Sequence, residues 1–436
     1  MNNLKLKNRI YDINAQRIFL PNGKVGEPYQ AKIDREKWNL TDLSYATFEP
    51  VEEIGLFFDK ETDCIQGTPI QSGDFKIKFL FRVTGEPENI PPHEKQVSIL
   101  INPDPKTLWK CKKSDRNALF WKRDNKMAYA ILGKKSLLAA SKRGRSHQND
   151  GAFRDDDFAY AHIERNGWSV VAVADGAGGY PLTREGSRIA CNTVIACFRQ
   201  GDDLNLDKEF ESMLQSYIKS KNTTQLKQAE NLSKQILYKA VLAVFNQIKA
   251  VAMETQTENP GLFNHPKAKN VSDYFHTTLV FAVFKEYEDI GWIILTFGVG
   301  DCPVAVINRE MTQTKLLNRL DVGDFGGGTR VVTQTGIFHS TEHPMAARFN
   351  FHIMKDFSYL FLMTDGIYDP KFEVETNLEN HEKWKGFLAD LRGKNEDEIN
   401  IFEPPIVNLF STRRLLRWMD FWATGNHDDR TLAIIY

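Results

Sequence analysis

The sequence predicts an α+β protein in which a small all-β domain precedes a larger domain of mixed strands and helices. The 436 residues exceed the length of one average domain. The first hundred residues contain short apolar runs broken by glycine and proline, which is typical of short strands. Apolar stripes with helical spacing begin only at Pro181, in the second part of the chain.

The first domain is predicted to span residues 1–102. Phe75 to Val83 alternates apolar and polar residues in its first half, and regularly spaced short strands favour an antiparallel sandwich. The segment from Gly55 to the Gly-Thr-Pro turn at Pro69 resembles the immunoglobulin-like repeat of many bacterial proteins. That resemblance covers residues 16–102 and implies a spacer or a protein-docking module, and the sequence leaves both open.

Residues 103–135 are predicted to connect this domain to a second one at residues 136–436. The connector is rich in Lys and Arg and contains Trp109 and Trp121. Tryptophans in a polar linker often pack onto a neighbouring domain, so we expect a wrapped segment, with a flexible tether as the alternative.

Composition argues against several classes of partner. The net charge of −1 gives no indication of binding to nucleic acid or to an anionic membrane. The N-terminus is polar and lacks a signal-peptide core, and no apolar run approaches the ~18 residues that span a bilayer. The five cysteines are scattered without zinc spacing, so we expect reduced thiols in a cytoplasmic protein.

An apolar run that ends in Asp-Gly recurs in the second domain. Trp168 to Ala174 leads into Asp175 and a glycine-rich turn, and Tyr359 to Met363 leads through Thr364 into Asp365 and Gly366. Each one alone is most simply a strand followed by a turn. Asp301 between two predicted strands and Asp428 before the last strand occupy comparable positions, and this recurrence favours a shared site.

A predicted hairpin adds two more carboxylates to this set. Pairing of residues 158–163 with residues 168–174 would bring Asp155 and Asp156 close to Asp175. Converging carboxylates repel one another unless a cation lies between them. Oxygen ligands without a His or Cys cluster indicate Mg²⁺ or Mn²⁺, and two such ions can activate water for attack at phosphorus. The residues therefore predict a metal-dependent hydrolase of phosphate esters.

The intervening segments complete the predicted second domain. Residues 142–157 are expected to form a polar loop, and residues 369–424 form an insertion to which the sequence assigns no role. Strands are predicted at 136–141 and 276–284 and, on both sides of a turn at Asp301, within 291–307. Helices are predicted at 181–200 and around 210–218 and 237–248.

The order of these motifs resembles the metal-dependent phosphatase 2C family of serine/threonine protein phosphatases. The resemblance covers residues 136–436 and rests on Arg-Asp-Asp before the hairpin, Val-Ala-Asp175-Gly-Ala-Gly-Gly, His-Thr-Thr278, Gly-Val-Gly-Asp301, Met-Thr-Asp365-Gly and Asp428-Asp-Arg-Thr431. It implies a central antiparallel β-sandwich flanked by helices, with two Mn²⁺ or Mg²⁺ ions at one end. It also implies a phosphorylated protein substrate and a cognate kinase as partners.

The resemblance also implies roles for individual residues. Asp175 would bridge both metals and the Gly176 carbonyl would contact one of them. Asp365 and Asp428 would complete the first metal site, and Asp155 or Asp156, with Asp156 preferred, would match the acidic entry pair. Asp301 with Asp365 resembles a third-metal site. Arg145, His147 and Arg154 compete for the role of phosphate ligand.

Two departures from the family pattern keep alternatives open. Ala177 follows the Asp-Gly where many members have a histidine that protonates the leaving alkoxide, and a strict Glu-Asp entry pair is missing. We therefore expect slower hydrolysis of alkyl than of aryl phosphates. A non-catalytic phosphoprotein-binding regulator of a kinase pathway and a hydrolase of small phosphate esters are the alternative functions.

Overall fold

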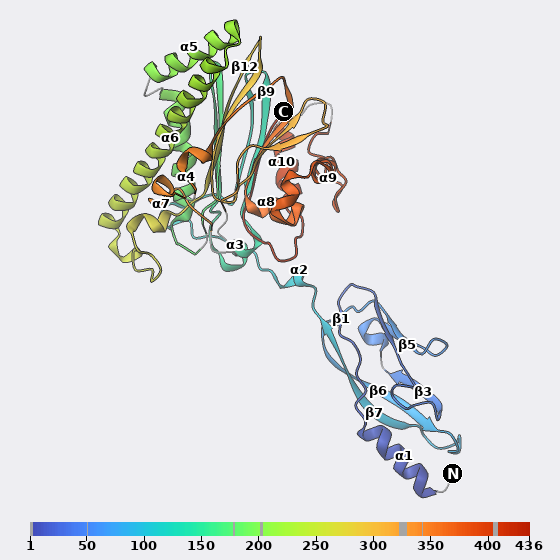
Figure 1. Cartoon of the computed structure of the whole chain (residues 1–436). Helices are drawn as coiled ribbons and strands as arrows, with labels where there is room; N and C mark the ends of the chain where they lie inside the picture. The colour runs from blue at the N-terminus through green and yellow to red at the C-terminus, as the bar shows by residue number, and fades with distance from the viewer. Residues whose placement is uncertain are drawn as a thin grey trace. The chain divides into compact units, whose positions relative to one another are not determined.

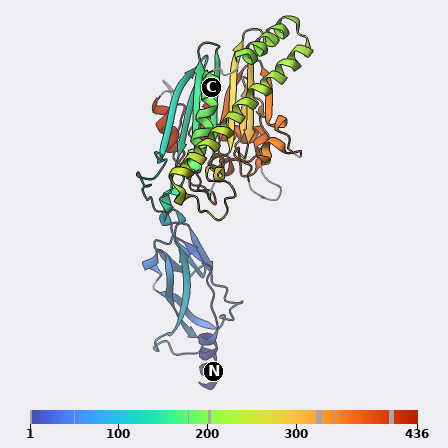
Figure 2. The same cartoon turned by 90° about the vertical axis from the view of Figure 1, so that its left-hand side faces the viewer.

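The computed structural model describes residues 3–49, 51–177, 179–200, 204–321, 329–341, 343–403 and 409–436. The chain forms two compact units, Met1–Trp109 and Lys110–Tyr436 (Figures 1 and 2). Gly178 of the predicted glycine-rich turn lies outside the described residues.

The first unit contains two small sheets, with strand orders β1-β7-β6-β3 and β2-β5-β4. Ile77 of β6 pairs with Val97 of β7, and both side chains enter one buried core because alternate residues of a strand point to the same face. The predicted β-rich region is thus confirmed, while the immunoglobulin-like assignment stays a prediction. The strands are β1 Gly23–Lys24, β2 Tyr29–Lys32, β3 Leu43–Glu49, β4 Leu56–Asp59, β5 Cys64–Gly67, β6 Gly73–Val83 and β7 His93–Asn102, and the helices are α1 Asn3–Ala15 and α2 Pro105–Leu108.

Helix α1 was not predicted from the sequence. Its Ile13 is fully buried in the core of the first unit, and Arg9 forms two 2.7 Å hydrogen bonds with Asp42. These tertiary contacts stabilise a helix whose own sequence carries only a weak apolar stripe.

The second unit contains two antiparallel sheets, with strand orders β10-β11-β12-β13-β16 and β15-β14-β17-β18-β9-β8. This α+β architecture is the one that the sequence predicts. The strands are β8 Asn125–Leu132, β9 Lys135–Lys142, β10 Asp157–Ile163, β11 Trp168–Ala174, β12 Leu279–Tyr287, β13 Gly291–Val299, β14 Val304–Asn308, β15 Thr314–Leu316, β16 Phe349–Met354, β17 Phe357–Met363 and β18 Arg430–Ile435.

Alternation along the strands creates three buried layers in this unit. Val171 and Val173 of β11 pack in the same cluster as Leu137 of β9, between the two sheets. Val170 and Ala172 point to the opposite face and pack with helices. Every residue of β11 is buried, as expected of a strand covered on both faces.

Helices cover both outer faces of this sandwich (Figure 1). Helices α4, α5 and α6 pack on the sheet that contains β11, and α8, α9 and α10 share a core with the other sheet. The predicted insertion 369–424 contributes Trp384 and Trp418 to this second core. The helices are α3 Arg145–Asp150, α4 Thr183–Gln200, α5 Leu204–Ser220, α6 Thr223–Glu258, α7 Gly336–His339, α8 Asp365–Phe372, α9 His381–Leu391 and α10 Leu409–Trp418.

Helix α6 is, within the described ranges, the one helix that is long and apolar enough to cross a membrane by length and composition. The expectation that no segment meets this criterion was therefore wrong. In the structure one face of α6, including Leu237, Val241 and Val244, is buried in the core of the second unit.

The structure also corrects three local predictions. Strand β8 lies within the predicted connector and pairs with β9 along its whole length, so that part belongs to the sandwich. The predicted polar loop at 142–157 contains helix α3, which ends at Gly151 in the left-handed conformation. Asp365 begins helix α8 rather than lying in a turn.

Candidate metal centre

The predicted aspartates lie at one end of the sandwich because of the strand register. Asp157 pairs with Ala174, which places the start of β10 beside the end of β11 and therefore Asp155 and Asp156 beside Asp175. In the other sheet, Met363 at the end of β17 pairs with Leu432 near the start of β18. Asp365 and Asp428 therefore lie at neighbouring strand ends. Asp301 lies between β13 and β14, next to the same edge.

The backbone of Asp175 is fixed by the His-Thr-Thr segment. Its carbonyl accepts hydrogen bonds of 2.8 Å from the Thr278 amide and from the Thr277 hydroxyl, and its amide donates to Thr278 Oγ1 at 2.9 Å. The peptide groups of Asp175 are thus satisfied locally. Its carboxylate lies among other acidic groups, since burial and, after it, the charges of Asp365, Asp156, Asp428 and Asp301 raise its pKa.

Close packing explains the two glycines that follow these aspartates. A Cβ at Gly176 would lie 2.8 Å from Asp155 Cβ, and one at Gly366 would lie 1.9 Å from the Asp429 carbonyl oxygen. Any larger residue would push these strand ends apart.

Asp156 is held by two hydroxyl groups from the other sheet. Its Oδ2 accepts hydrogen bonds from Thr364 Oγ1 at 2.8 Å and from Thr431 Oγ1 at 2.7 Å. Its Oδ1 is buried and has no hydrogen-bond partner among the described residues, and the same is true of Asp301 Oδ1 and Asp365 Oδ1. Buried carboxylate oxygens without a donor are costly, so these three atoms fit a bound cation.

The electrostatics of the cluster lead to the same conclusion. Burial, followed by the charge of Asp429, raises the pKa of Asp156 to about 7 and that of Asp155 to about 6. Burial and then the neighbouring carboxylates raise the pKa values of Asp175 and Asp365 well above the ordinary range. Burial is also the main cause of the raised pKa values of Asp301 and Asp428. The chain therefore concentrates negative charge that a divalent cation would neutralise.

Asp429, which sequence reasoning did not single out, organises the loop that carries Asp155 and Asp156. Its Oδ1 accepts from the Gly144 amide at 2.6 Å and its Oδ2 accepts from the Asp155 amide at 2.5 Å. Burial alone would raise the pKa of Asp429, but His147 and these amides outweigh it and lower the pKa. Asp429 is thus an anchor for the loop that carries the entry residues.

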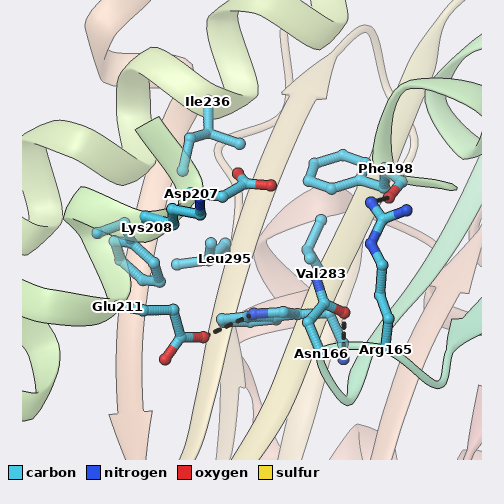
Figure 3. Close-up of a pocket in the computed structure, with 11 residues that line it drawn as sticks. Arg165, Asn166, Phe198, Asp207, Lys208, Glu211, Ile236, Val283 and Leu295 are labelled. Atoms are coloured by element: carbon cyan, nitrogen blue, oxygen red, sulfur yellow. Dashed lines mark hydrogen bonds between the residues drawn. The ribbon is translucent and has the colours of Figure 1, made fainter. Parts of the chain in front are cut away.

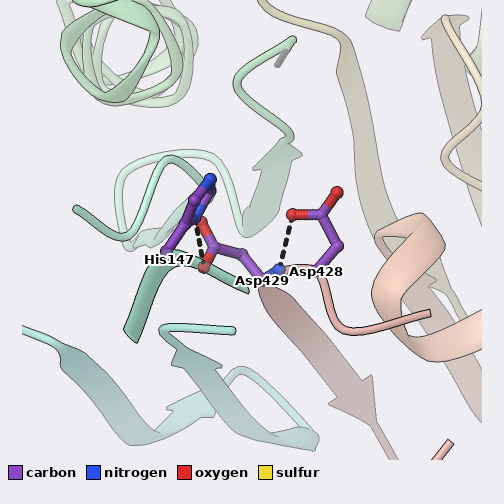
Figure 4. Close-up of side chains that lie close together, drawn as sticks. All are labelled: His147, Asp428 and Asp429. Carbon is purple, nitrogen blue, oxygen red and sulfur yellow. Dashed lines mark hydrogen bonds and ion pairs between the residues drawn. The ribbon is translucent and has the colours of Figure 1, made fainter. Parts of the chain in front are cut away.

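His147 forms an ion pair with Asp429, with 3.0 Å between Nδ1 and Oδ1 (Figure 4). Burial alone would lower the pKa of His147, but Asp429 and its acidic neighbours raise it to about 10. His147, Asp428 and Asp429 also bring ligand atoms within 4.8 Å of one another. The imidazolium that results lies beside the acidic cluster.

The other two predicted phosphate ligands have protein partners. Arg154 is buried and donates to Ser141 Oγ at 2.7 Å and to the Asp156 and Arg123 carbonyls. Arg145 donates to the carbonyls of Asp420 at 2.6 Å and Phe421 at 3.1 Å. The contacts of Arg154 with the cluster are to the backbone of Asp156, whereas His147 lies beside a carboxylate, with 3.9 Å between its Nε2 and Asp155 Oδ2.

Ala177 lies opposite His276. The amide of Ala177 donates to the His276 carbonyl at 3.0 Å, next to the bridge between Gly176 and Thr277. The His276 ring bonds Thr333 Oγ1 through Nδ1 at 2.5 Å, and burial lowers its pKa. The His276 ring is therefore neutral and is held by Thr333. The backbone of His276 is the part that pairs with position 177.

Comparison with known proteins identifies the fold family. The family model for protein phosphatase 2C matches residues 143–403, which is more than half of the chain. No curated protein sequence matches the chain.

Several solved structures are similar at low identity. They include a sex-determining protein from C. elegans (14% identity, 68% of this chain and 64% of that chain, TM-score 0.35). The phosphatase MsPP from Mycobacterium smegmatis in complex with cacodylate has 15% identity over 69% of this chain and 97% of that chain, with a TM-score of 0.30. A phosphatase from Toxoplasma gondii has 11% identity over 71% of this chain and 94% of that chain, with a TM-score of 0.38. The chain thus spans just under two thirds of the C. elegans protein. On the family-model match, the chain belongs to the protein phosphatase 2C family.

Proposed function

We propose that this protein is a Mn²⁺- or Mg²⁺-dependent serine/threonine phosphoprotein phosphatase. The observation that carries the proposal is the set of converging carboxylates at the end of the sandwich. Three of them have a buried oxygen that finds no donor in the described part of the chain. Repulsion among so many buried carboxylates destabilises the folded state. Bound cations would remove this repulsion, so the cluster is best explained as a cation site.

The proposed ligands are Asp175, the Gly176 carbonyl, Asp156, Asp365 and Asp428. Asp156 is preferred to Asp155 because its Oδ1 is buried without a hydrogen-bond partner in the described ranges, whereas the Asp155 carboxylate lies near His147. Asp301, together with Asp365, is proposed to bind a third ion.

These residues would hold divalent cations, whose chemistry when bound would be to lower the pKa of water and to offset the charge that develops at phosphorus. The residues of the chain then position the reacting groups. Thr364 and Thr431 orient Asp156, while Thr277 and Thr278 hold Asp175. The His147 imidazolium supplies a positive charge that can attract a phosphate oxygen.

The proposed substrate is a phosphorylated protein, with the kinase that modifies it as a further partner and the cytoplasm as location. One observation favours the alternative, a phosphoprotein-binding regulator with little catalysis. The methyl side chain of Ala177 cannot donate a proton to the leaving group, and the nearby His276 ring is hydrogen-bonded to Thr333. Protonation of an alkoxide leaving group would then fall to water.

The test is hydrolysis of an aryl phosphate and of a phosphothreonine peptide, each with Mn²⁺, Mg²⁺ or a chelator. Asp175→Asn and Asp365→Asn are expected to lose about 10³-fold or more in kcat, because each removes a charge on which cation binding depends. Asp289→Asn, an exposed aspartate in the β12–β13 turn, is the matched control and should retain full activity. Metal binding by the wild type without turnover of either substrate would reject the phosphatase and favour the regulator.

A further inference from the structure

A basic pocket lies on the segment that precedes β8 in the second unit. The pocket has a volume of about 540 Å³, and its lining includes Lys113, Arg116, Trp121, Arg123 and Asp124. Lys113, Arg116 and Arg123 are all exposed. Among the residues that the structure describes, none of these three cations has a carboxylate partner, whereas Asp124 is paired with the buried Arg143 at 3.1 Å. The pocket thus presents unneutralised positive charge in a chain whose net charge is −1.

Trp121 gives this charge a defined geometry. The Arg116 guanidinium lies 5.7 Å from the centre of the Trp121 ring. Stacking against an aromatic face uses the plane of the guanidinium and leaves its N–H edge available for a bidentate anion. A phosphate group, with several acceptor oxygens and two negative charges, is the ligand that such an edge and two further cations match best.

The wall of the pocket is held rigidly by buried side chains of the catalytic unit. The carbonyls of Leu119 and Phe120 accept from Arg184, at 2.6 and 3.0 Å, and the Arg123 carbonyl accepts from Arg154 Nε at 3.2 Å. The segment therefore turns these carbonyls inward, while Arg116 and Arg123 are exposed. A site held in this way is preorganised and loses little entropy when it binds a ligand.

The same contacts connect the pocket to the candidate metal centre. Lys122, between Trp121 and Arg123, donates to the Asp156 carbonyl at 2.9 Å, and Arg154 donates to that carbonyl as well as to Arg123. A ligand in the pocket would thus contact the segment that supports a proposed metal ligand.

We propose that this pocket binds a second phosphorylated residue of the protein substrate, separate from the residue that is hydrolysed. The inference rests on the proposed function, because that function makes the ligand a phosphoprotein. The size of the pocket suits one phosphorylated side chain and its neighbours.

The binding test uses Trp121 fluorescence in the presence of a chelator, which prevents turnover and leaves the acidic cluster repelling phosphate. A phosphoserine peptide is expected to change the fluorescence of the wild type but not that of Trp121→Phe. Arg116→Gln/Arg123→Gln should weaken binding about tenfold or more, as expected for lost charge-assisted contacts. Lys249→Gln, an exposed cation on α6, should bind like the wild type.

Three results would overturn the proposal. These are equal binding of the phosphorylated and unphosphorylated peptides, unchanged binding by the double variant with native circular dichroism, and binding of inorganic phosphate as tight as that of the phosphopeptide. The last result would identify a free-anion site.

A kinetic arm separates this inference from the proposed function. With Mn²⁺, the double variant should hydrolyse an aryl phosphate at the wild-type kcat/KM but show an increased KM for a doubly phosphorylated peptide. An unchanged KM would contradict the inference. Absence of all turnover in the wild type, with fluorescence binding intact, would reject the phosphatase and still support the pocket.

Discussion

The two ends of the sandwich in the second unit both carry acidic side chains, but they satisfy them differently. At the end where β11 begins, Glu211 lines a pocket (Figure 3). Its Oε1 accepts from Trp168 Nε1 at 3.1 Å, Lys285 Nζ at 2.8 Å and Tyr287 Oη at 2.7 Å. At the end where β11 stops, Asp156 Oδ1 and Asp365 Oδ1 are buried and have no donor among the residues that the structure describes. A carboxylate that the protein neutralises itself stabilises the fold, whereas one left without donors requires a partner from outside.

The contrast is sharpest between two consecutive residues. Asp157 lies 2.9 Å from Lys122 and 2.6 Å from Lys126, and although burial alone would raise its pKa, these lysines and Arg154 lower it. The Asp156 carboxylate has no such cation among the described side chains, and burial raises its pKa to about 7. Successive side chains at the start of a strand point to opposite faces, so the Asp157 carboxylate faces the lysines and the Asp156 carboxylate faces the acidic cluster.

The largest expected effects come from exchanging these two aspartates for asparagine. Asp157→Asn should destabilise the protein by about 3–5 kcal/mol, because it leaves Lys122 buried without its counter-charge. Asp156→Asn should instead raise the metal-free melting temperature by ~1–2 °C, as expected for about 1 kcal/mol in a unit larger than about 250 residues. The melting temperature should rise because the asparagine amide at position 156 is neutral and removes one negative charge from the cluster. Thermal melts in chelator measure both.

Turnover measurements should show the reverse order of effects: the variant that keeps its stability, Asp156→Asn, should be the one that loses activity. Asp156→Asn is expected to lose about 10²-fold or more in metal-dependent turnover, while correctly folded Asp157→Asn keeps most of it. If both variants were destabilised equally and Asp156→Asn kept its activity, the distinction between a structural and a functional carboxylate would not hold at this strand.

A smaller effect is expected from pH in the absence of metal. A carboxyl whose pKa is raised by folding binds more protons in the folded than in the unfolded state, so stability falls as pH rises. For Asp156 this loss runs from the ordinary value of about 4 up to about 7. His147, with a pKa of about 10, is charged throughout most of this window in both states, so the carboxylates dominate.

Melting temperatures between pH 4 and 7 test this expectation. They should fall with rising pH in chelator and should fall less, or rise, with Mn²⁺, because the ion binds the deprotonated cluster. Identical pH profiles with and without Mn²⁺ would indicate that these carboxylates do not bind the metal.

The sequence predicted the positions of the aspartates better than their surroundings. An apolar strand followed by Asp is a local pattern, so the placement of Asp175 and Asp365 at strand ends could be predicted. The hydroxyl partners of Asp156 could not, because Thr364 and Thr431 lie 208 and 275 residues away in the chain. Asp429 was missed for a related reason: its amide partners Gly144 and Asp155 are brought to it only by sheet pairing.

The smallest expected effect concerns Glu211 at the opposite end. Glu211→Gln keeps an acceptor for Trp168 and Tyr287 but loses the charge that pairs with Lys285, a partly exposed contact. The cost should be about 1 kcal/mol or less, measured by denaturant unfolding, with turnover within about twofold of the wild type. Glu211 also lines a cavity of about 410 Å³ with Phe198, Ile236 and Leu295, so a substantial loss of activity in Glu211→Gln would show that this end of the sandwich communicates with the acidic end. The two ends of the sandwich would then both affect turnover. A buried carboxylate oxygen without a donor would no longer distinguish carboxylates needed for activity from those needed for stability.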